Sequence, residues 1–123
     1  MLKRTLLAAA LAAALPAHAA KNKTVNLEAI GTFETGIFDD SAAEIVAYDP
    51  AGYRLFVINA AEGAVDVLDI SDPSEPELVD FIDVNDDFPE GVVGGVNSVT
   101  VREGLVAVAV ENDDKQANGW AAF

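Results

Sequence analysis

The strands of this chain carry apolar side chains on both faces, and no other feature restricts the possible folds as strongly. Residues 55–58 read Leu-Phe-Val-Ile and residues 106–110 read Val-Ala-Val-Ala-Val. A strand that is covered on one face only alternates between apolar and polar residues. An uninterrupted apolar run therefore predicts a strand that is buried on both faces, inside a sheet packed between two other layers.

Nearly every periodic segment after residue 20 has strand character, and none has a sustained helical stripe. Turn signals such as Asp49-Pro50-Ala51-Gly52, Ser71-Asp72-Pro73 and Glu103-Gly104 separate these segments. The chain is therefore predicted to be all-β, an antiparallel meander with short connections. Strands are expected at residues 25–35, 43–48, 54–60, 64–70, 77–84, 97–102, 105–111 and 119–123.

The strand pattern occurs twice. When residues 44–70 are laid over residues 97–123, Val46 falls on Val99 and Leu55 on Leu105, at offsets of 53 and 50 residues. A period near 50 residues with four short strands in each repeat is typical of β-propeller blades. A blade packs between two neighbouring blades, which explains strands that are apolar on both faces. We expect one complete four-stranded antiparallel blade over residues 41–84 and most of a second from residue 96 onward.

Propellers close with about four to eight blades. A chain with one to two blades is therefore expected to be the N-terminal fragment of a longer protein, truncated within the apolar strand at residues 119–123. The expected partners are the remaining blades of that parent. Expressed alone, residues 20–123 are expected to be inactive and either partly unfolded or self-associated, because their apolar faces and open strand edge lack neighbours.

The first 19 residues have the three regions of a bacterial signal peptide. Lys3 and Arg4 precede an Ala/Leu-rich segment at residues 5–15, and Ala17-His18-Ala19 forms a small-x-small cleavage site. The apolar segment is well short of the roughly 20 residues that span a bilayer. We expect a secreted, periplasmic or cell-surface protein with no membrane span in its mature chain. Its parts are a signal peptide (1–19), an N-terminal strand and lead-in (20–40) and an incomplete propeller region (41–123).

The charge and the missing residue types exclude several kinds of function. Residues 20–123 carry five Lys and Arg against 21 Asp and Glu, a net charge of about −16, which repels nucleic acid and anionic lipid and attracts cations. The alternative explanation of this acidic composition is solubility in a salty extracellular medium, without a specific role in binding cations. The chain has no cysteine, and its one histidine, His18, lies in the signal peptide. Thiolate metal sites and Ser-His-Asp triads are therefore excluded within these residues, which leaves oxygen chemistry.

Several blocks of the sequence resemble a known family. Residues 65–73, Val-Asp-Val-Leu-Asp-Ile-Ser-Asp-Pro, are similar to the LVIVD-type propeller repeat. Residues 30–50, 55–73 and 94–111 together resemble the start of the bacterial choice-of-anchor I family, in the family's order. The resemblance implies an exported, propeller-like protein several times longer than this chain. Members are often labelled alkaline phosphatases, although a fold alone does not determine an activity.

Polar residues at strand ends are the candidate metal ligands. Glu44 and Asn97 occupy corresponding places at the start of the two innermost strands, where a propeller lines its channel, and Glu111 ends the next strand. Two carboxylates and an amide suit calcium, which takes six to eight oxygen ligands. We predict calcium as the cofactor and assign no residue a catalytic role. The alternative is that each side chain caps a strand or bonds a neighbouring backbone amide.

Other acidic residues are expected to be structural. The run at residues 83–87 has the first spacings of an EF-hand loop, but Phe88 and Gly94 stand where that loop needs Gly and Glu. A solvated acidic loop is therefore expected there. Asp69 and Asp72 lie in a Pro-containing turn and are expected to cap backbone N–H groups.

Two functions from different classes follow. In the first, the parent is a metal-dependent phosphoesterase, alkaline phosphatase-like, whose propeller holds an oxygen-ligated metal at its channel and acts on a phosphoester substrate. In the second, the propeller is a non-catalytic extracellular module that binds a protein or glycan at the cell surface. Further inward-facing carboxylates and a base or nucleophile in the remaining blades would favour the enzyme.

Overall fold

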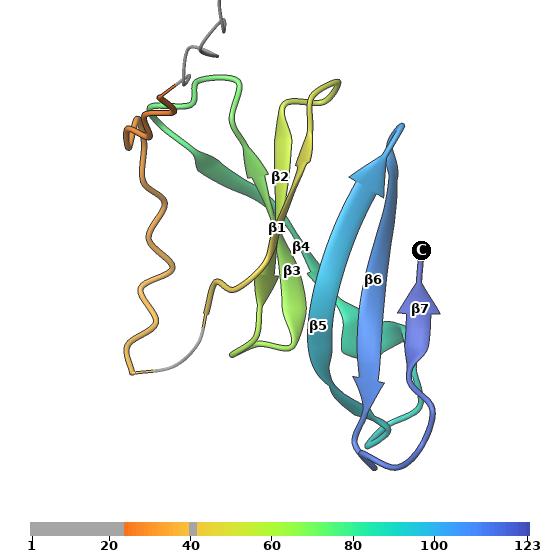
Figure 1. The fold of residues 1–123 in the computed structure, drawn as a ribbon. Coiled ribbons are helices and arrows are strands. Elements are labelled where there is room, and N and C mark those ends of the chain that lie inside the picture. The colour runs from red at the N-terminus through yellow and green to blue at the C-terminus, as the bar shows by residue number, and fades with distance from the viewer. Residues whose placement is uncertain (1–23, 40–41) are drawn as a thin grey trace, which may run out of the picture.

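The structure is a computed structural model that describes residues 24–39 and 42–123. Two antiparallel sheets lie next to each other (Figure 1). Sheet A is a four-stranded meander and sheet B a three-stranded one, so the predicted all-β fold of antiparallel, blade-like meanders is confirmed. The elements are β1 (Val46–Asp49), β2 (Arg54–Asn59), β3 (Ala64–Asp69), β4 (Glu77–Asp83), the 3₁₀ turn η1 (Val84–Asp87), β5 (Val93–Arg102), β6 (Leu105–Asn112) and β7 (Trp120–Ala122).

The hydrophobic core lies between the two sheets, where β5 packs against β1 and β2 (Figure 1). Ile58 and Val65 are directly opposite each other in the pairing of β2 with β3, so both side chains point to the same face of sheet A. Both are fully buried. Burial of a side chain of this size contributes about 1.5–3 kcal/mol to folding. Sheet B faces them with Val96, Val99, Val108 and Val110.

The hairpin turns form at the turn residues that the sequence indicates. Between β5 and β6, Glu103 and Gly104 both have positive φ, 52° and 81°, which makes the two-residue turn that matches the twist of paired strands. Between β1 and β2, the Asp49 carboxylate accepts hydrogen bonds from the N–H groups of Ala51 (3.2 Å) and Gly52 (3.1 Å). The carboxylate thereby fixes the longer turn.

Each sheet also has a second face, which no other described strand covers. On sheet A this outer face includes Tyr48 and Phe81, whose side chains are 50% and 44% exposed. On sheet B it includes the smaller residues Thr100, Ala107 and Ala109. The strands are therefore apolar on both faces, but only one face of each sheet is buried against the other sheet.

The strand expected at residues 25–35 does not form, and this prediction is wrong. Residues 24–38 contain no strand, and Val25 and Leu27 are 81% and 96% exposed. Their alternating pattern suits a strand, but the segment pairs with neither edge strand of sheet A, β1 or β4, and a strand forms only where it is paired. The segment instead runs beside the β3–β4 loop, where Gly31 lies so close to the carbonyl oxygen of Pro73 that a Cβ would clash with it. The expected signal peptide, residues 1–19, lies outside the described residues.

Candidate rim site

A β-bulge sets the position of Asn97. In the pairing of β5 with β6, Val96 lies opposite Val110 and Ser98 lies opposite Ala109, so Asn97 is an extra residue without a partner of its own. A bulge adds one residue to one strand, bends that strand and redirects the side chain at that point. The Asn97 side chain is exposed.

Glu44 occupies a bulge of the same kind in sheet A. The N–H of Ile58 donates to the carbonyl oxygen of Ile45 (2.8 Å), while the N–H of Glu44 donates to the carbonyl oxygen of Ile58 (3.2 Å). Glu44 and Ile45 therefore both face Ile58, and the regular ladder starts only at Val46. The Glu44 side chain is exposed, like that of Asn97.

The two bulges are at equivalent places in the two sheets. Val46 pairs with Val57 and Val99 pairs with Val108, which gives offsets of 53 residues for the first strand and 51 for the second. The difference arises because the β1–β2 turn has two more residues than the β5–β6 turn. On this register the residues opposite the bulges, Ile58 and Ala109, correspond to each other.

This register corrects the repeat as read from the sequence. The predicted match of Leu55 with Leu105 is wrong by one residue, because the 51-residue offset places Leu55 on Val106. A slip of one residue exchanges the two faces of a strand. The predicted match of Glu44 with Asn97 agrees with the register, and these two residues are the bulged ones.

Two of the three predicted ligands lie together. The Asn97 amide Nδ2 donates to Glu111 Oε2 (3.4 Å), and Lys115 forms an ion pair with Glu111 Oε1. Glu44 is not in this group but lies next to β1, in the sheet that packs against β5. Among the described residues, no three acidic or histidine side chains gather closely enough to hold a metal. We call Glu44, Asn97 and Glu111 the rim site.

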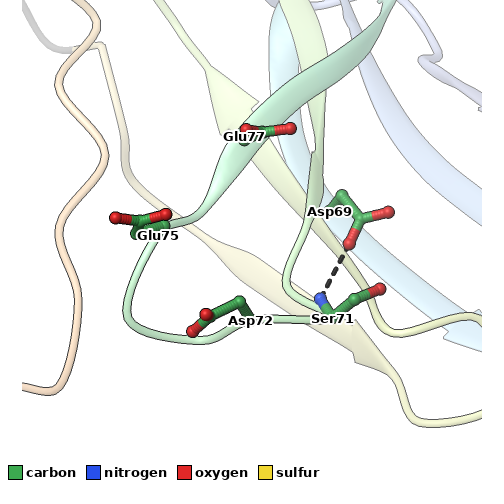
Figure 2. A pocket seen from close by; sticks show the side chains of 5 residues that line it. All are labelled: Asp69, Ser71, Asp72, Glu75 and Glu77. Carbon is green, nitrogen blue, oxygen red and sulfur yellow. Dashed lines mark hydrogen bonds between the residues drawn. The ribbon is translucent and has the colours of Figure 1, made fainter.

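A second group of acidic residues lies elsewhere, around the β3–β4 loop (Figure 2). Asp69, Ser71, Asp72, Glu75 and Glu77 surround a shallow hollow there. Asp69 accepts a hydrogen bond from the Ser71 N–H (2.7 Å) and forms an ion pair with Arg54. Asp72 accepts from the N–H and hydroxyl of Ser74, at 2.9 and 2.6 Å. The prediction that Asp69 and Asp72 cap backbone N–H groups is confirmed.

These bonds also change how the two carboxyl groups titrate. Hydrogen bonds from the side chain and the backbone N–H of Ser71, followed by the interaction with Arg54, lower the pKa of Asp69 from 3.8 to about 2. Hydrogen bonds from Ser74 lower the pKa of Asp72. Because these hydrogen bonds favour the ionised carboxylates, Asp69 and Asp72 stabilise the loop in their charged forms.

The acidic run after β4 is also structural. Asp83 caps η1, because its Oδ1 accepts hydrogen bonds from the backbone N–H (2.9 Å) and the side-chain amide (2.8 Å) of Asn85. The Asp83 carboxylate is thereby used within the chain, at the start of a 3₁₀ turn. The EF-hand spacing is therefore coincidental, as the sequence indicates.

The model of the choice-of-anchor I domain matches residues 44–123. The chain belongs to the choice-of-anchor I family. The match starts at Glu44, the bulged residue of sheet A, and includes both sheets. No curated protein and no solved structure matches the chain. Membership in the choice-of-anchor I family supports a surface-associated extracellular protein.

No helix of the described residues is long and apolar enough to cross a membrane.

Sequence reasoning missed two features of this choice-of-anchor I domain. The first feature is the pair of bulges at Glu44 and Asn97. In β5 the signal was present in the sequence, because two consecutive polar residues, Asn97 and Ser98, separate the core residues Val96 and Val99 where a regular strand would have one. The second feature is a buried polar pair, Asn59 and Asp66, which are 4% and 5% exposed. Both are polar residues within otherwise apolar strands, and that interruption was the available signal.

Proposed function

We propose that this choice-of-anchor I chain supplies blades of an extracellular, non-catalytic binding module, and that the module engages its ligand at the rim site with the help of calcium. The observation that carries the proposal is the repeated bulge. Glu44 and Asn97 are both exposed, and they occupy equivalent bulged positions in two different sheets. A repeated irregularity that turns a polar side chain outward in each blade suits a binding rim.

The donor atoms at the rim fit an oxygen-seeking cation. Asn97 directs its Nδ2 to Glu111, which leaves its Oδ1 free to coordinate. Carboxylate and amide oxygens are the ligands that calcium takes, and the chain's net charge of −14 raises the local concentration of cations. Lys115 competes for Glu111, so calcium binding must displace that ion pair.

Thermal unfolding in the presence of calcium tests this function. A ligand that binds only the native state stabilises it by mass action, so calcium should raise the Tm of the exported protein. Glu44→Gln should reduce that increment at least twofold. The control is Glu90→Gln, which makes the same charge change in an exposed loop and should keep the full increment. An equal calcium response in Glu44→Gln and wild type would contradict a role for the rim site.

A phosphoesterase is the second candidate function, favoured by the same oxygen donors and by the family resemblance. A metal at the rim would supply charge stabilisation for a phosphoester. Hydrolysis of p-nitrophenyl phosphate by the exported protein distinguishes the two candidates. Calcium-dependent turnover that falls in Glu44→Gln would support the enzyme, whereas calcium binding without turnover would support the binding module.

A further inference from the structure

A pocket of about 280 Å³ lies between the N-terminal segment and the outer face of sheet A. Phe33 and Ile37 of the segment form one wall, and Phe81 of β4 forms another. The polar residues of the pocket are Asn59, Glu62 and Asp66. We call this the Asp66 pocket. It is separate from the rim site and shares no residue with it.

The buried carboxylate of Asp66 is the unusual group in this pocket. Asp66 is only 5% exposed, and its neighbours across the strands are the apolar Val57 on β2 and Phe81 on β4. Its hydrogen-bond partner among the described residues is the Asn59 amide, whose Nδ2 lies 3.2 and 3.4 Å from the two carboxylate oxygens. Burying a carboxylate is costly unless it is well paired.

The Asn59 amide is itself held in place. The backbone N–H of Glu62 donates to Asn59 Oδ1 (3.3 Å), which leaves Nδ2 to face Asp66. One neutral amide therefore serves a carboxylate that can accept about four hydrogen bonds. Asp66 has unused acceptor capacity in a pocket whose described lining residues include a second carboxylate, Glu62, and no basic side chain.

We propose that the Asp66 pocket binds a cationic nitrogen group, an ammonium or a guanidinium. Such a group would pair with Asp66, donate to its unused lone pairs and pack against the rings of Phe33 and Phe81, which attract cations over their faces. The volume is just below that of pockets for drug-sized ligands, so it suits a group of side-chain size. The group can come from a free small amine or from a Lys or Arg side chain of another protein.

The test is calorimetric titration of the full chain with butylammonium and, as a neutral probe of equal length, 1-butanol. We expect saturable binding of butylammonium and none of butanol. Asp66→Asn should weaken butylammonium binding at least tenfold. The control Asp80→Asn, which makes the same change at an exposed position of β4, should bind like wild type.

A second probe separates the two sources of the group. A blocked Gly-Arg-Gly peptide that binds with Asp66 dependence, where butylammonium does not, would support the proposal and assign the group to a protein side chain. Should Asp66→Asn fail to fold, Phe81→Leu keeps the carboxylate and removes one ring, and it should weaken binding of the cationic probe severalfold. Binding of neither cationic probe, or equal binding of butylammonium and butanol, would overturn the proposal.

Discussion

At the scale of single residues, the acidic side chains at the strand ends and turns of this chain include two groups that differ in what they contact. Asp69, Asp72 and Asp83 accept hydrogen bonds from backbone N–H groups two residues ahead of them. Glu44 is exposed at a bulge just before β1, where its backbone N–H donates to the carbonyl oxygen of Ile58. The first group stabilises turns, and the second is available to a ligand. An acidic composition alone does not separate the two groups.

The capping role of Asp69 predicts a particular dependence on acid. Its pKa is lowered from 3.8 to about 2, so the folded state favours the charged form. The stability that Asp69 supplies is therefore present above about pH 4 and is lost as the pH falls toward 2. Asp69→Asn should lower the urea midpoint at pH 6 and have a smaller effect at pH 2.5. Equal effects at both pH values would show that the carboxylate charge plays no part.

At the scale of elements, the bulge means that Asn97 can be deleted without changing the register of β5. Removing Asn97 leaves Val96 opposite Val110 and next to Ser98, as in a regular ladder, so the core contacts of Val96 persist. We expect this deletion to cost about 1–2 kcal/mol of unfolding free energy, since only local bending changes.

Deleting Thr100 from the same strand is the matched control. That change shifts the register of every residue before it and turns Val99 and Val96 away from the core, where they are 6% and 4% exposed. Losing the burial of two valines removes about 3 kcal/mol or more. Urea unfolding followed by circular dichroism compares the two deletions. A larger loss from the Asn97 deletion would contradict the bulge.

Much of sheet A could be predicted from the sequence, since β2, β3 and β4 start at the expected residues Arg54, Ala64 and Glu77. Apolar runs and Gly- or Pro-containing turns are local signals, and they gave these starts and the turn at Glu103. Register is not local, because it depends on the length of each turn. For that reason the bulge at Glu44 and the true match of Leu55 required the structure.

The error at residues 25–35 has the same origin. An alternating pattern shows that a segment can form a strand, but strand formation depends on an edge elsewhere in the molecule. The same distinction between local signals and long-range contacts applies to the candidate site. The equivalence of Glu44 and Asn97 was visible in the repeat, whereas the contact of Asn97 with Glu111 and the competing Lys115 were not.

At the scale of the whole molecule, the outer faces of the two sheets determine how the chain behaves in solution. Tyr48 and Phe81 on sheet A and Leu105 on sheet B are 44–59% exposed. Apolar sheet faces of this kind promote association. Residues 20–123 expressed alone should therefore form oligomers whose size rises with concentration.

Analytical ultracentrifugation of wild type and Tyr48→Glu measures this association. The added charge on the outer face of sheet A should weaken self-association at least tenfold. Ala117→Glu adds the same charge in an exposed loop and should associate like wild type. A wild-type chain that stays monomeric at every concentration would show that the outer faces need no partner.

Calcium titration of the isotope-labelled chain, followed residue by residue in ¹H–¹⁵N spectra, gives the most direct test of the rim site. The spectra compare two acidic surfaces within one molecule. We expect saturable shifts of the Glu44, Asn97 and Glu111 amides, with smaller changes in the β3–β4 loop, whose carboxylates Asp69 and Asp72 already cap the turn. Shifts confined to the β3–β4 loop, or shifts that grow linearly without saturation, would contradict a calcium-assisted binding rim.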